Sequence, residues 1–436
     1  MADLIVGVFI ILFLVMVLLL KIEWFIFTNL LFLMISSIIN NPDILSVNIL
    51  GIQLYTQDLF FLSQMICIVF YVVKMIFLKD ALIQSPYFKT SFLLFILIVF
   101  KVLFAFPTQG TVAFLEGKHF LYFFGNILFF SVAKLSNQRL KSILKIILFL
   151  AVCYLSFALL RYFEFLPHLY EGLDMGWEGT FNEARLLNRS DLMYPVIGSI
   201  ISLVLIFSNF YKKEDVYLSI YILLFFLFST LILFSETRSI ILCFIMSMVG
   251  FLFLNKLISI RLVLMLSVIL LPIFILASLF DISFLSKYFT AFSYQNLFGQ
   301  NSTLVFRNVV SLVYLQYMTV ESYFFGMTLA DAPIVFQNLY FEPTGGKVGL
   351  HNFFVECIYY FGIPIFIVLL YLYFTVLKKL SLMKKNNDNI IIINTLILSN
   401  IAYFFLYLAW SPDVLNGILM GISINLIANN ELGNQG

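Results

Sequence analysis

Chemistry in this chain depends on a few polar side chains that interrupt or border long apolar runs. The chain has 3 histidines, and His351 stands directly before an apolar run that also contains Asn352 and Glu356. Imidazole can take up a proton near neutral pH, and ionisable groups beside a membrane are functional candidates. We predict that His351 contacts a substrate, with Asn352 and Glu356 on one face of the following helix. The alternative makes Asn352 a helix N-cap and His351 an interfacial side chain.

A second polar break separates two apolar runs and carries Arg238. The sequence there reads Ser235-Glu236-Thr237-Arg238-Ser239, so the arginine must lie at the membrane interface or slightly below it. A planar guanidinium can donate two parallel hydrogen bonds to one phosphate. We predict that Arg238 binds a phosphorylated ligand, with Glu236 beside it. The alternative is an arginine that anchors a tight hairpin to lipid phosphate.

Three further arginines stand in polar segments. Arg185 and Arg189 would lie one turn apart on a helix, a spacing that could bracket a diphosphate. A pair that snorkels to the lipid headgroups is the alternative. Arg307 falls in an amphipathic pattern from Val305 to Leu312, which predicts a helix. We expect Arg307 to point toward the membrane, and a solvated polar face is the alternative.

A further candidate is the histidine region around His119. His119 stands beside Glu116 and Lys118 at the start of an apolar run and could line a substrate path. Acidic residues between 281 and 351 are sparse and form no pair suited to a metal. The 4 cysteines fall inside apolar runs, without metal-ligand or redox spacing. We therefore predict no metal and no cofactor.

The elements that must position these residues are membrane helices. The chain has 436 residues, 62% of them hydrophobic and 11% charged, whereas a soluble domain is about half apolar and a quarter charged. Because apolar runs long enough to cross about 30 Å of hydrocarbon recur, the sequence predicts an all-α polytopic membrane protein with about 12–14 transmembrane helices. The predicted spans are 3–20, 23–40, 56–78, 90–106, 114–134, 142–164, 191–210, 216–235, 238–255, 261–280, 352–378, 388–410 and 413–429.

Basic residues in short connections set the orientation of these spans. The connections at 134–145, 212–213, 256–261 and 378–385 are basic and alternate with the spans, so we assign them to the cytoplasm. The loops at 165–190 and 281–351 then fall outside, together with Glu236 and His351. For the first two spans, 3–20 and 23–40, only Lys21 and Glu23 bear on the orientation.

The chain shows no repeat and no linker, so residues 1–436 are predicted to form a single membrane domain. The 281–351 segment would be a large, partly helical loop that packs over the outer face. The net charge of +2 gives no reason to expect nucleic acid as a partner.

Several short motifs follow one another in a fixed order along the chain. They are Gly179-Thr180-Phe181-Asn182, Thr237-Arg238, Arg307, Phe325-Gly326-Met327 and His351-Asn352-Phe353-Phe354, followed by Glu356 and Gly362. This order resembles the O-antigen ligase and O-antigen polymerase superfamily. The resemblance covers about 175 to 375 by motif and the whole chain by the layout of its spans.

This resemblance implies a GT-C-like glycosyltransferase of the bacterial inner membrane that needs no metal and acts on the periplasmic face. Its donor would be an oligosaccharide linked to undecaprenyl diphosphate. By the ligase pattern, Arg238 and Arg307 would bind the donor diphosphate and His351 the acceptor hydroxyl. The expected partners are the lipid-linked oligosaccharide, membrane lipid and a chain-length regulator.

The resemblance leaves the acceptor open. A polymerase passes the glycan to the end sugar of a lipid-linked repeat unit, whereas a ligase passes it to lipid A-core. The stretch from Phe336 to Leu350 departs from the ligase pattern, and polymerases vary more than ligases, so we expect an O-antigen polymerase. A flippase for lipid-linked oligosaccharides is a further alternative, but it predicts pseudo-symmetric halves, and this chain has one lopsided loop.

Overall fold

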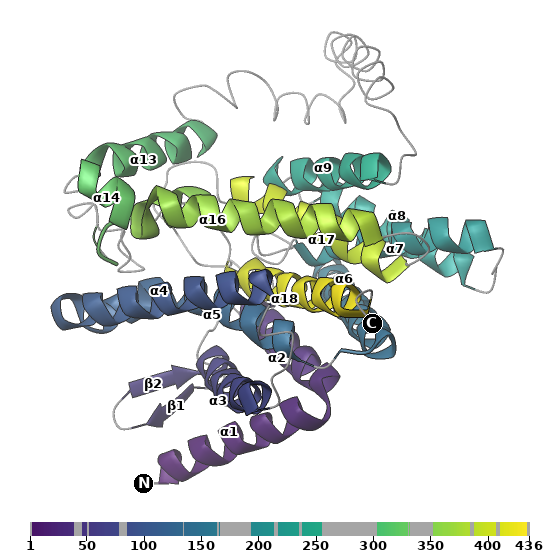
Figure 1. Ribbon diagram of the computed structural model, residues 1–436. Helices are drawn as coiled ribbons and strands as arrows, with labels where there is room; N and C mark the ends of the chain where they lie inside the picture. The colour runs from purple at the N-terminus through teal and green to yellow at the C-terminus, as the bar shows by residue number, and fades with distance from the viewer. Residues whose placement is uncertain are drawn as a thin grey trace. The chain divides into compact units, whose positions relative to one another are not determined.

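The computed structural model describes residues 2–38, 46–49, 52–77, 85–133, 135–163, 165, 193–212, 217–234, 238–254, 303–329, 331, 352–383, 388–406 and 410–433. Helices dominate these residues (Figure 1). They are α1 (Ala2–Leu20), α2 (Ile22–Ile38), α3 (Thr56–Phe77), α4 (Pro86–Gln109), α5 (Thr111–Val132), α6 (Asn137–Tyr162), α7 (Met193–Lys212), α8 (Leu218–Phe234), α9 (Arg238–Leu254), α13 (Thr303–Tyr317), α14 (Val320–Phe325), α16 (Phe353–Met383), α17 (Asp388–Leu406) and α18 (Trp410–Gly433).

The helices follow the apolar runs closely. Each predicted span coincides with one helix, except 261–280, which lies outside the described residues. Among the described residues, 4 helices contain stretches that are long and apolar enough to cross a membrane: Thr56–Lys74, Pro86–Gln109, Gln138–Leu160 and Phe353–Met383. Shorter apolar helices accompany them. These observations confirm the coarse prediction of an α-helical membrane protein.

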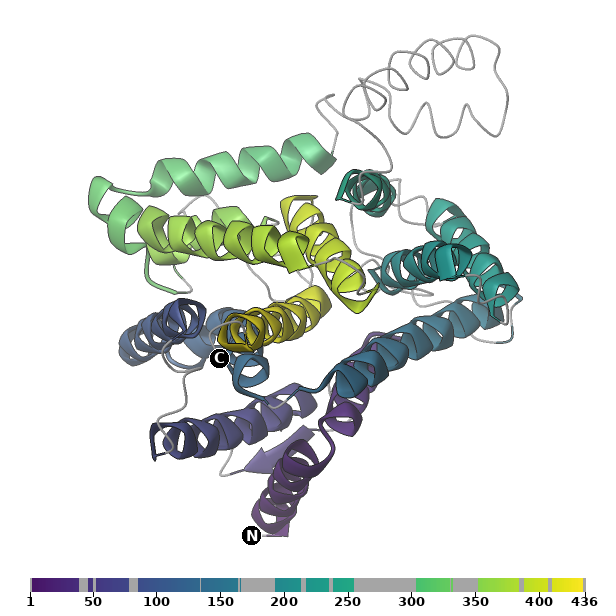
Figure 2. The ribbon, with the colours of Figure 1, turned by 45° about the vertical axis from the view of Figure 1, so that its right-hand side comes forward.

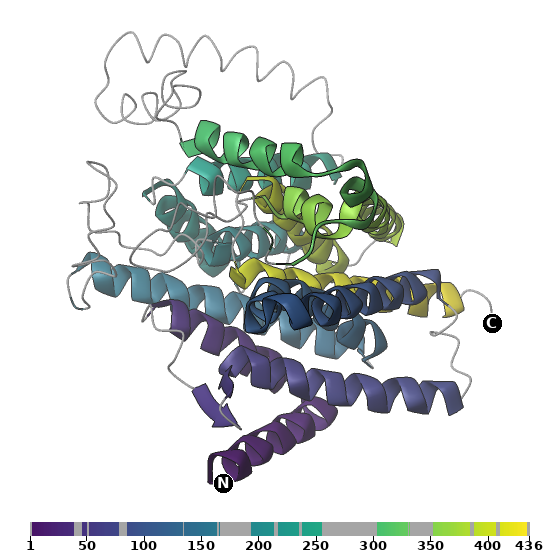
Figure 3. The same cartoon turned by 90° about the vertical axis from the view of Figure 1, so that its left-hand side faces the viewer.

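One hairpin departs from the all-α prediction. Strands β1 (Ser46–Ile49) and β2 (Ile52–Tyr55) are antiparallel, with Ser46 opposite Tyr55 and Ile49 opposite Ile52. Apolar and polar residues alternate along both strands, and the link between them contains a glycine, which favours a hairpin. The hairpin packs against α1 and α3 (Figure 3), so it has a helical surface to cover one face.

The chain divides into two compact units. Unit 1 comprises Met1–Leu231, Ile367–Ile397 and Ala409–Gly436. Unit 2 comprises Ile232–Phe366 and Leu398–Leu408. The single membrane domain expected from the sequence stays a prediction.

Unit 1 is organised around α5, which packs most extensively against α18 (Figure 2). Two glycines of α18 permit this contact. A Cβ added at Gly417 would lie 2.5 Å from the carbonyl oxygen of Phe123, and one at Gly421 would lie 2.7 Å from that of Ile127. Small residues four apart let membrane helices approach at backbone distance. The Gly417/Gly421 pair therefore accounts for the close packing of α18 on α5.

Side-chain hydrogen bonds join α18 to the C-terminal end of α5. The Asn425 side-chain amide donates hydrogen bonds to the carbonyl oxygens of Ser131 (2.8 Å) and Ala133 (2.7 Å). These carbonyls belong to the C-terminal end of α5, where no helical partner remains. Along both helices, the residue numbers of the contacting positions increase together, so α5 and α18 run parallel.

Helix α3 joins α5 through side chains. Gln64 Nε2 donates to Asn126 Oδ1 at 2.8 Å. The Tyr122 hydroxyl donates to the Asp58 carboxylate, which also accepts from the backbone N–H of Tyr55 at 2.8 Å. The residue numbers of these pairs again increase together along α3 and α5, so α3, α5 and α18 all run in one direction. That is the relation that alternating spans predict for 56–78, 114–134 and 413–429.

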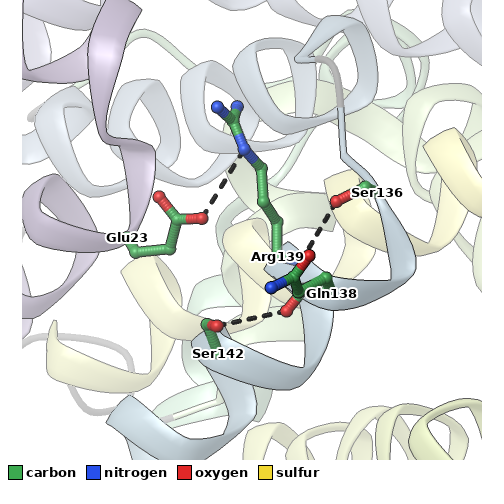
Figure 4. Close-up of polar contacts among 5 residues, drawn as sticks. All are labelled: Glu23, Ser136, Gln138, Arg139 and Ser142. Carbon is green, nitrogen blue, oxygen red and sulfur yellow. Dashed lines mark hydrogen bonds and ion pairs between the residues drawn. The ribbon is translucent and has the colours of Figure 1, made fainter.

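An ion pair links the beginnings of α2 and α6 (Figure 4). Glu23 Oε1 lies 3.6 Å from Arg139 Nε. The backbone N–H of Arg139 donates to the Ser136 hydroxyl at 3.2 Å, so Ser136 acts as an N-cap for α6. The link between α1 and α2 therefore lies on the same side of unit 1 as the basic connection at 134–145. This agrees with the predicted alternation where the sequence offered least support.

Candidate functional site

The first part of the site is the start of α16, which Asn352 caps. Asn352 Oδ1 accepts hydrogen bonds from the backbone N–H groups of Phe354 (3.0 Å) and Val355 (3.2 Å). Its carbonyl oxygen accepts from the N–H of Glu356 at 2.9 Å. The cap role considered for Asn352 is thus confirmed. It fixes the backbone immediately after His351, and His351 itself lies outside the described residues.

Glu356 lies one turn into α16, as its spacing from Asn352 predicts. Its side chain is only 4% exposed. A carboxyl group in apolar surroundings is costly unless polar groups accompany it, and in membrane proteins such groups mark functional positions. Because its side chain is buried, Glu356 is not an ordinary solvent-exposed carboxylate.

Gly362 divides α16 into two helical pieces. Its backbone, at φ 82° and ψ 166°, adopts a conformation that glycine alone reaches without strain. Pro364 follows, and proline suits the first turn of a new helix because it lacks an N–H group. The sequence predicts one continuous span at 352–378, and the Gly-Ile-Pro sequence is the physical reason for the break.

A turn after α14 packs directly on this break. Gly326 has φ 72°, and a Cβ there would lie under 3.0 Å from the backbone of Tyr360 and Phe361. A Cβ at Gly362 would meet the backbone of Phe324 in the same way. The N–H of Met327 donates to the carbonyl oxygen of Tyr359 at 2.7 Å. We call this contact between 324–327 and 359–362 the glycine junction.

The glycine junction unites two motifs that lie far apart in the sequence. Phe325-Gly326-Met327 ends α14, and Gly362 ends the helical piece that Asn352 begins. Neither glycine has room for a side chain, because a Cβ at either one would meet backbone atoms of the other segment. The geometry of the turn therefore depends on the start of α16.

A tyrosine cluster adjoins the junction, and sequence reasoning missed it. The rings of Tyr314 and Tyr359 meet edge to face with centroids 4.9 Å apart. Tyr317 and Asp331 lie close enough to Tyr359 to interact with it electrostatically. The Tyr359 hydroxyl is buried and has no hydrogen-bond partner within the described part of the chain. The available signal was weak: Tyr314 and Tyr317 are three residues apart just beyond the helix predicted from Val305 to Leu312, and two adjacent tyrosines stand at 359–360.

The predicted arginines are described only in part. Arg307 lies within α13, so the predicted helix is confirmed. Val310 and Tyr314, four residues apart, are buried, but Val309 and Leu312 are exposed and apolar, so the amphipathic character stays a prediction. In Figures 1 and 2, α13 runs alongside the first part of α16. Arg238 is the first residue of α9. The side chains of both arginines lie outside the described residues, so the direction of Arg307 stays a prediction.

Other predicted positions fall elsewhere. Arg185, Arg189 and Glu236 lie outside the described residues. His119 belongs to unit 1, where it is buried within α5 beside the ring of Phe120, with centroids 4.1 Å apart. The structure thus brings Asn352 and Glu356 together with the Gly326 turn in unit 2.

This arrangement can hold the backbone next to His351 in one geometry and can present polar groups at the start of a membrane-spanning helix. No protein-family model matches the chain, and no curated protein matches it.

Proposed function

We propose that the protein is an O-antigen polymerase, which transfers a glycan from undecaprenyl diphosphate to the end sugar of a second lipid-linked repeat unit. The observation that carries this proposal is the glycine junction. It joins the Phe325-Gly326-Met327 turn to the His351–Gly362 segment, and these are two of the motifs on which the resemblance to O-antigen polymerases and ligases rests. Physical contact between them supports a shared role in one site.

The proposed reaction replaces one bond at the anomeric carbon of the donor. The acceptor hydroxyl attacks that carbon, the bond to the diphosphate oxygen breaks, and the hydroxyl proton leaves. Undecaprenyl diphosphate departs as an anion. Guanidinium groups aimed at this oxygen stabilise the developing charge. We assign this role to Arg238 and Arg307, with Arg185 and Arg189 as further diphosphate ligands.

His351 would act on the acceptor. Arginine does not give up its proton at working pH, so the arginines cannot assist deprotonation of the hydroxyl. Imidazole can. The Asn352 cap supports this role because it holds the residue directly after His351 in a defined backbone conformation. Glu356 on the same helix would position the acceptor, with Glu236 beside Arg238.

The proposed setting is the bacterial inner membrane, with the reaction on the periplasmic face and no metal required. A membrane protein with helices long enough to span is compatible with this setting. A chain-length regulator would be the protein partner. Ligation to lipid A-core and lipid flipping are the outcomes that the experiments must exclude.

Variants of Arg238 test the donor role. In cells that lack the gene, Arg238→Ala and Arg238→Lys should both abolish chain elongation at normal protein levels, since loss of one such donor typically costs about 100-fold or more in rate. Arg139→Ala is the matched control, because Arg139 pairs with Glu23 in unit 1. Normal glycan ladders from Arg238→Ala cells would refute the donor role.

Variants of His351 separate two forms of acceptor role. General base catalysis contributes roughly 100- to 10,000-fold, so His351→Ala should leave only a trace of elongation while donor binding persists. His351→Gln keeps a hydrogen bond but takes up no proton. Substantial elongation by His351→Gln would show that His351 positions the hydroxyl and is not its base.

A further inference from the structure

The Tyr359 hydroxyl is a buried polar group that the proposed reaction does not use. The Tyr359 side chain is fully buried, and its hydroxyl has no hydrogen-bond partner within the described part of the chain. Leaving a buried donor without a partner destabilises a protein, so such groups are rare in native structures and call for an explanation. A ligand that accepts a hydrogen bond from this hydroxyl would remove the penalty.

The groups around this hydroxyl form an aromatic and polar cluster that reaches the protein surface. Tyr314 packs its ring edge to face on Tyr359, with centroids 4.9 Å apart. Tyr317, one turn further along α13, and Asp331 lie close enough to Tyr359 to interact with it electrostatically. Tyr314 is buried, whereas Tyr317 and Asp331 are partly exposed. Tyr317 and Asp331 therefore mark the side from which a ligand could approach.

Backbone hydrogen bonds hold the polar groups of this cluster in place. The N–H of Met327 donates to the Tyr359 carbonyl oxygen at 2.7 Å, and the N–H of Asp331 donates to the carbonyl oxygen of Thr328 at 3.1 Å. Leu329, within that turn, is buried. The turn that carries Asp331 is thus fixed to the helix that carries Tyr359, so the carboxylate and the phenol keep a defined spacing.

A phenol, a carboxylate and aromatic rings together suit a sugar. Ligand sites combine apolar and aromatic walls with a few polar groups that fix orientation. One sugar hydroxyl can accept from the phenol and another can donate to the carboxylate. The Asp331 carboxylate would repel a phosphate, and a polyprenyl chain has no polar atom to pair with the phenol. The chemistry of the cluster therefore favours the glycan over its lipid carrier.

The cluster lies on the same face of α16 as the two residues already placed in the site. Asn352, Glu356 and Tyr359 share this face because their spacings of four and three residues match the helical repeat. At about 1.5 Å per residue, Tyr359 lies about 10 Å beyond Asn352 along the helix axis. The proposed function places the reacting hydroxyl at the Asn352 end. A sugar at Tyr359 would therefore stand further along the glycan than the sugar that reacts.

We propose that the Tyr359 hydroxyl and the Asp331 carboxylate form a sugar-binding subsite for an inner ring of the acceptor glycan. The phenol would donate to one ring hydroxyl, the carboxylate would accept from another, and Tyr317 would cover the ring. A site built to bond a hydroxyl discriminates strongly against an analogue that lacks it. That the bound glycan is the acceptor rests on the proposed function, whereas its sugar character rests on the cluster.

Two phenylalanine variants of the full chain in lipid nanodiscs test the subsite. Tyr359→Phe removes a hydroxyl without a partner in the described part of the chain, so the melting temperature should stay unchanged or rise. Tyr323→Phe is the matched control. The Tyr323 hydroxyl donates to the Leu315 carbonyl oxygen at 2.6 Å, so its loss should lower the melting temperature.

The same nanodiscs report binding of two probes. One is the undecaprenyl-diphosphate-linked repeat unit isolated from the native strain, and the other is undecaprenyl phosphate, which carries no sugar. We expect Tyr359→Phe to weaken binding of the repeat unit about 2- to 10-fold, because one hydrogen bond is lost, and to bind undecaprenyl phosphate normally. Asp331→Asn should also weaken binding of the repeat unit, and Tyr323→Phe should bind both probes normally.

Three results with Tyr359→Phe would overturn the subsite. They are unchanged binding of the repeat unit, an equal loss for both probes, and a melting temperature that falls as far as that of Tyr323→Phe. The last result would show that the hydroxyl already has a structural partner.

Elongation assays on the same proteins separate this inference from the proposed function. If the wild-type protein elongates repeat units and Tyr359→Phe does so with an unchanged KM, the subsite is refuted and the polymerase stands. If the wild-type protein binds repeat units in the expected pattern but passes them to lipid A-core, the subsite is supported and the polymerase is refuted.

Discussion

Two regions of this protein bring backbones together through glycine, with different consequences. In the α5–α18 contact of unit 1, Gly417 and Gly421 lie within a regular helix, and side-chain hydrogen bonds such as that of Asn425 reinforce the contact. In the glycine junction of unit 2, Gly326 and Gly362 both have positive φ and face backbone atoms. The first contact can adjust by a small helix shift. The second cannot, which suits a region that must hold one geometry.

The largest effect is expected at the junction. Gly362→Ala and Gly326→Ala each impose a positive φ on a residue with a Cβ, which costs about 1–3 kcal/mol, and each adds overlap with backbone atoms that cannot rotate away. We expect elongation to be lost and the start of α16 to become more accessible to protease. Glycan ladders and limited proteolysis provide the measurements.

Gly110→Ala is the control for these variants. Gly110 also has positive φ, 59°, but a Cβ there meets nothing within 4 Å. Backbone strain acts at all three positions, whereas overlap acts only at the junction. If Gly110→Ala abolishes elongation as completely as Gly362→Ala, strain alone explains the loss and the junction has no special importance.

A smaller effect, mainly on stability, is expected in unit 1. Gly417→Ala would push α18 away from the Phe123 carbonyl, and overpacking of this kind costs about 1–3 kcal/mol. The melting temperature in detergent should fall, while elongation at permissive temperature persists. Gly125→Ala is the matched variant, because the nearest atoms to its Cβ belong to the side chains of Phe61 and Met65, which are only partly buried, and not to backbone. An equal loss of stability in both variants would argue against a rigid α5–α18 contact.

The helix cap at Asn352 sharpens the comparison within unit 2. Asn352→Ala removes both cap hydrogen bonds, and loss of such a cap costs about 1 kcal/mol. Asn352→Asp retains the cap. We expect elongation to decline with Ala and to persist with Asp. Failure of both variants at normal protein levels would show that the Asn352 amide itself contacts substrate.

The smallest effect is expected for Glu23→Gln. The Glu23–Arg139 pair is partly exposed, at 22% and 40%, and its atoms are 3.6 Å apart. Exposed ion pairs contribute about 0–1 kcal/mol, so stability and elongation should hardly change. A large loss of stability or elongation would mean that this pair fixes the orientation of helices α1 and α2, in addition to holding α2 beside α6.

The sequence predicts the helices well because hydrocarbon demands long apolar runs with satisfied backbones. It also predicts that α3, α5 and α18 run parallel, since basic connections alternate with the spans. It does not predict the break at Gly362, because an apolar composition continues across it and only the Gly-Ile-Pro sequence marks it. The hairpin at 46–55 was missed because each strand is 4 residues long.

The site was predictable in its residue types more than in its geometry. Asn352 and Glu356 were found from their spacing, and Gly326 and Gly362 from the motifs that contain them. Their contact across distant segments leaves no local signal, because it is made by backbone atoms. The tyrosine cluster around Tyr359 was likewise hidden among many aromatic residues that face lipid.

Reconstitution tests the central claim most directly. Purified protein would be placed in liposomes with a lipid-linked repeat unit, and the glycan products would be separated by length. We predict that the repeat units lengthen with release of undecaprenyl diphosphate, that Arg238→Ala fails, and that Gly110→Ala succeeds. Repeat units that only cross the bilayer, or that stay unextended while lipid A-core becomes glycosylated, would contradict the proposed polymerase.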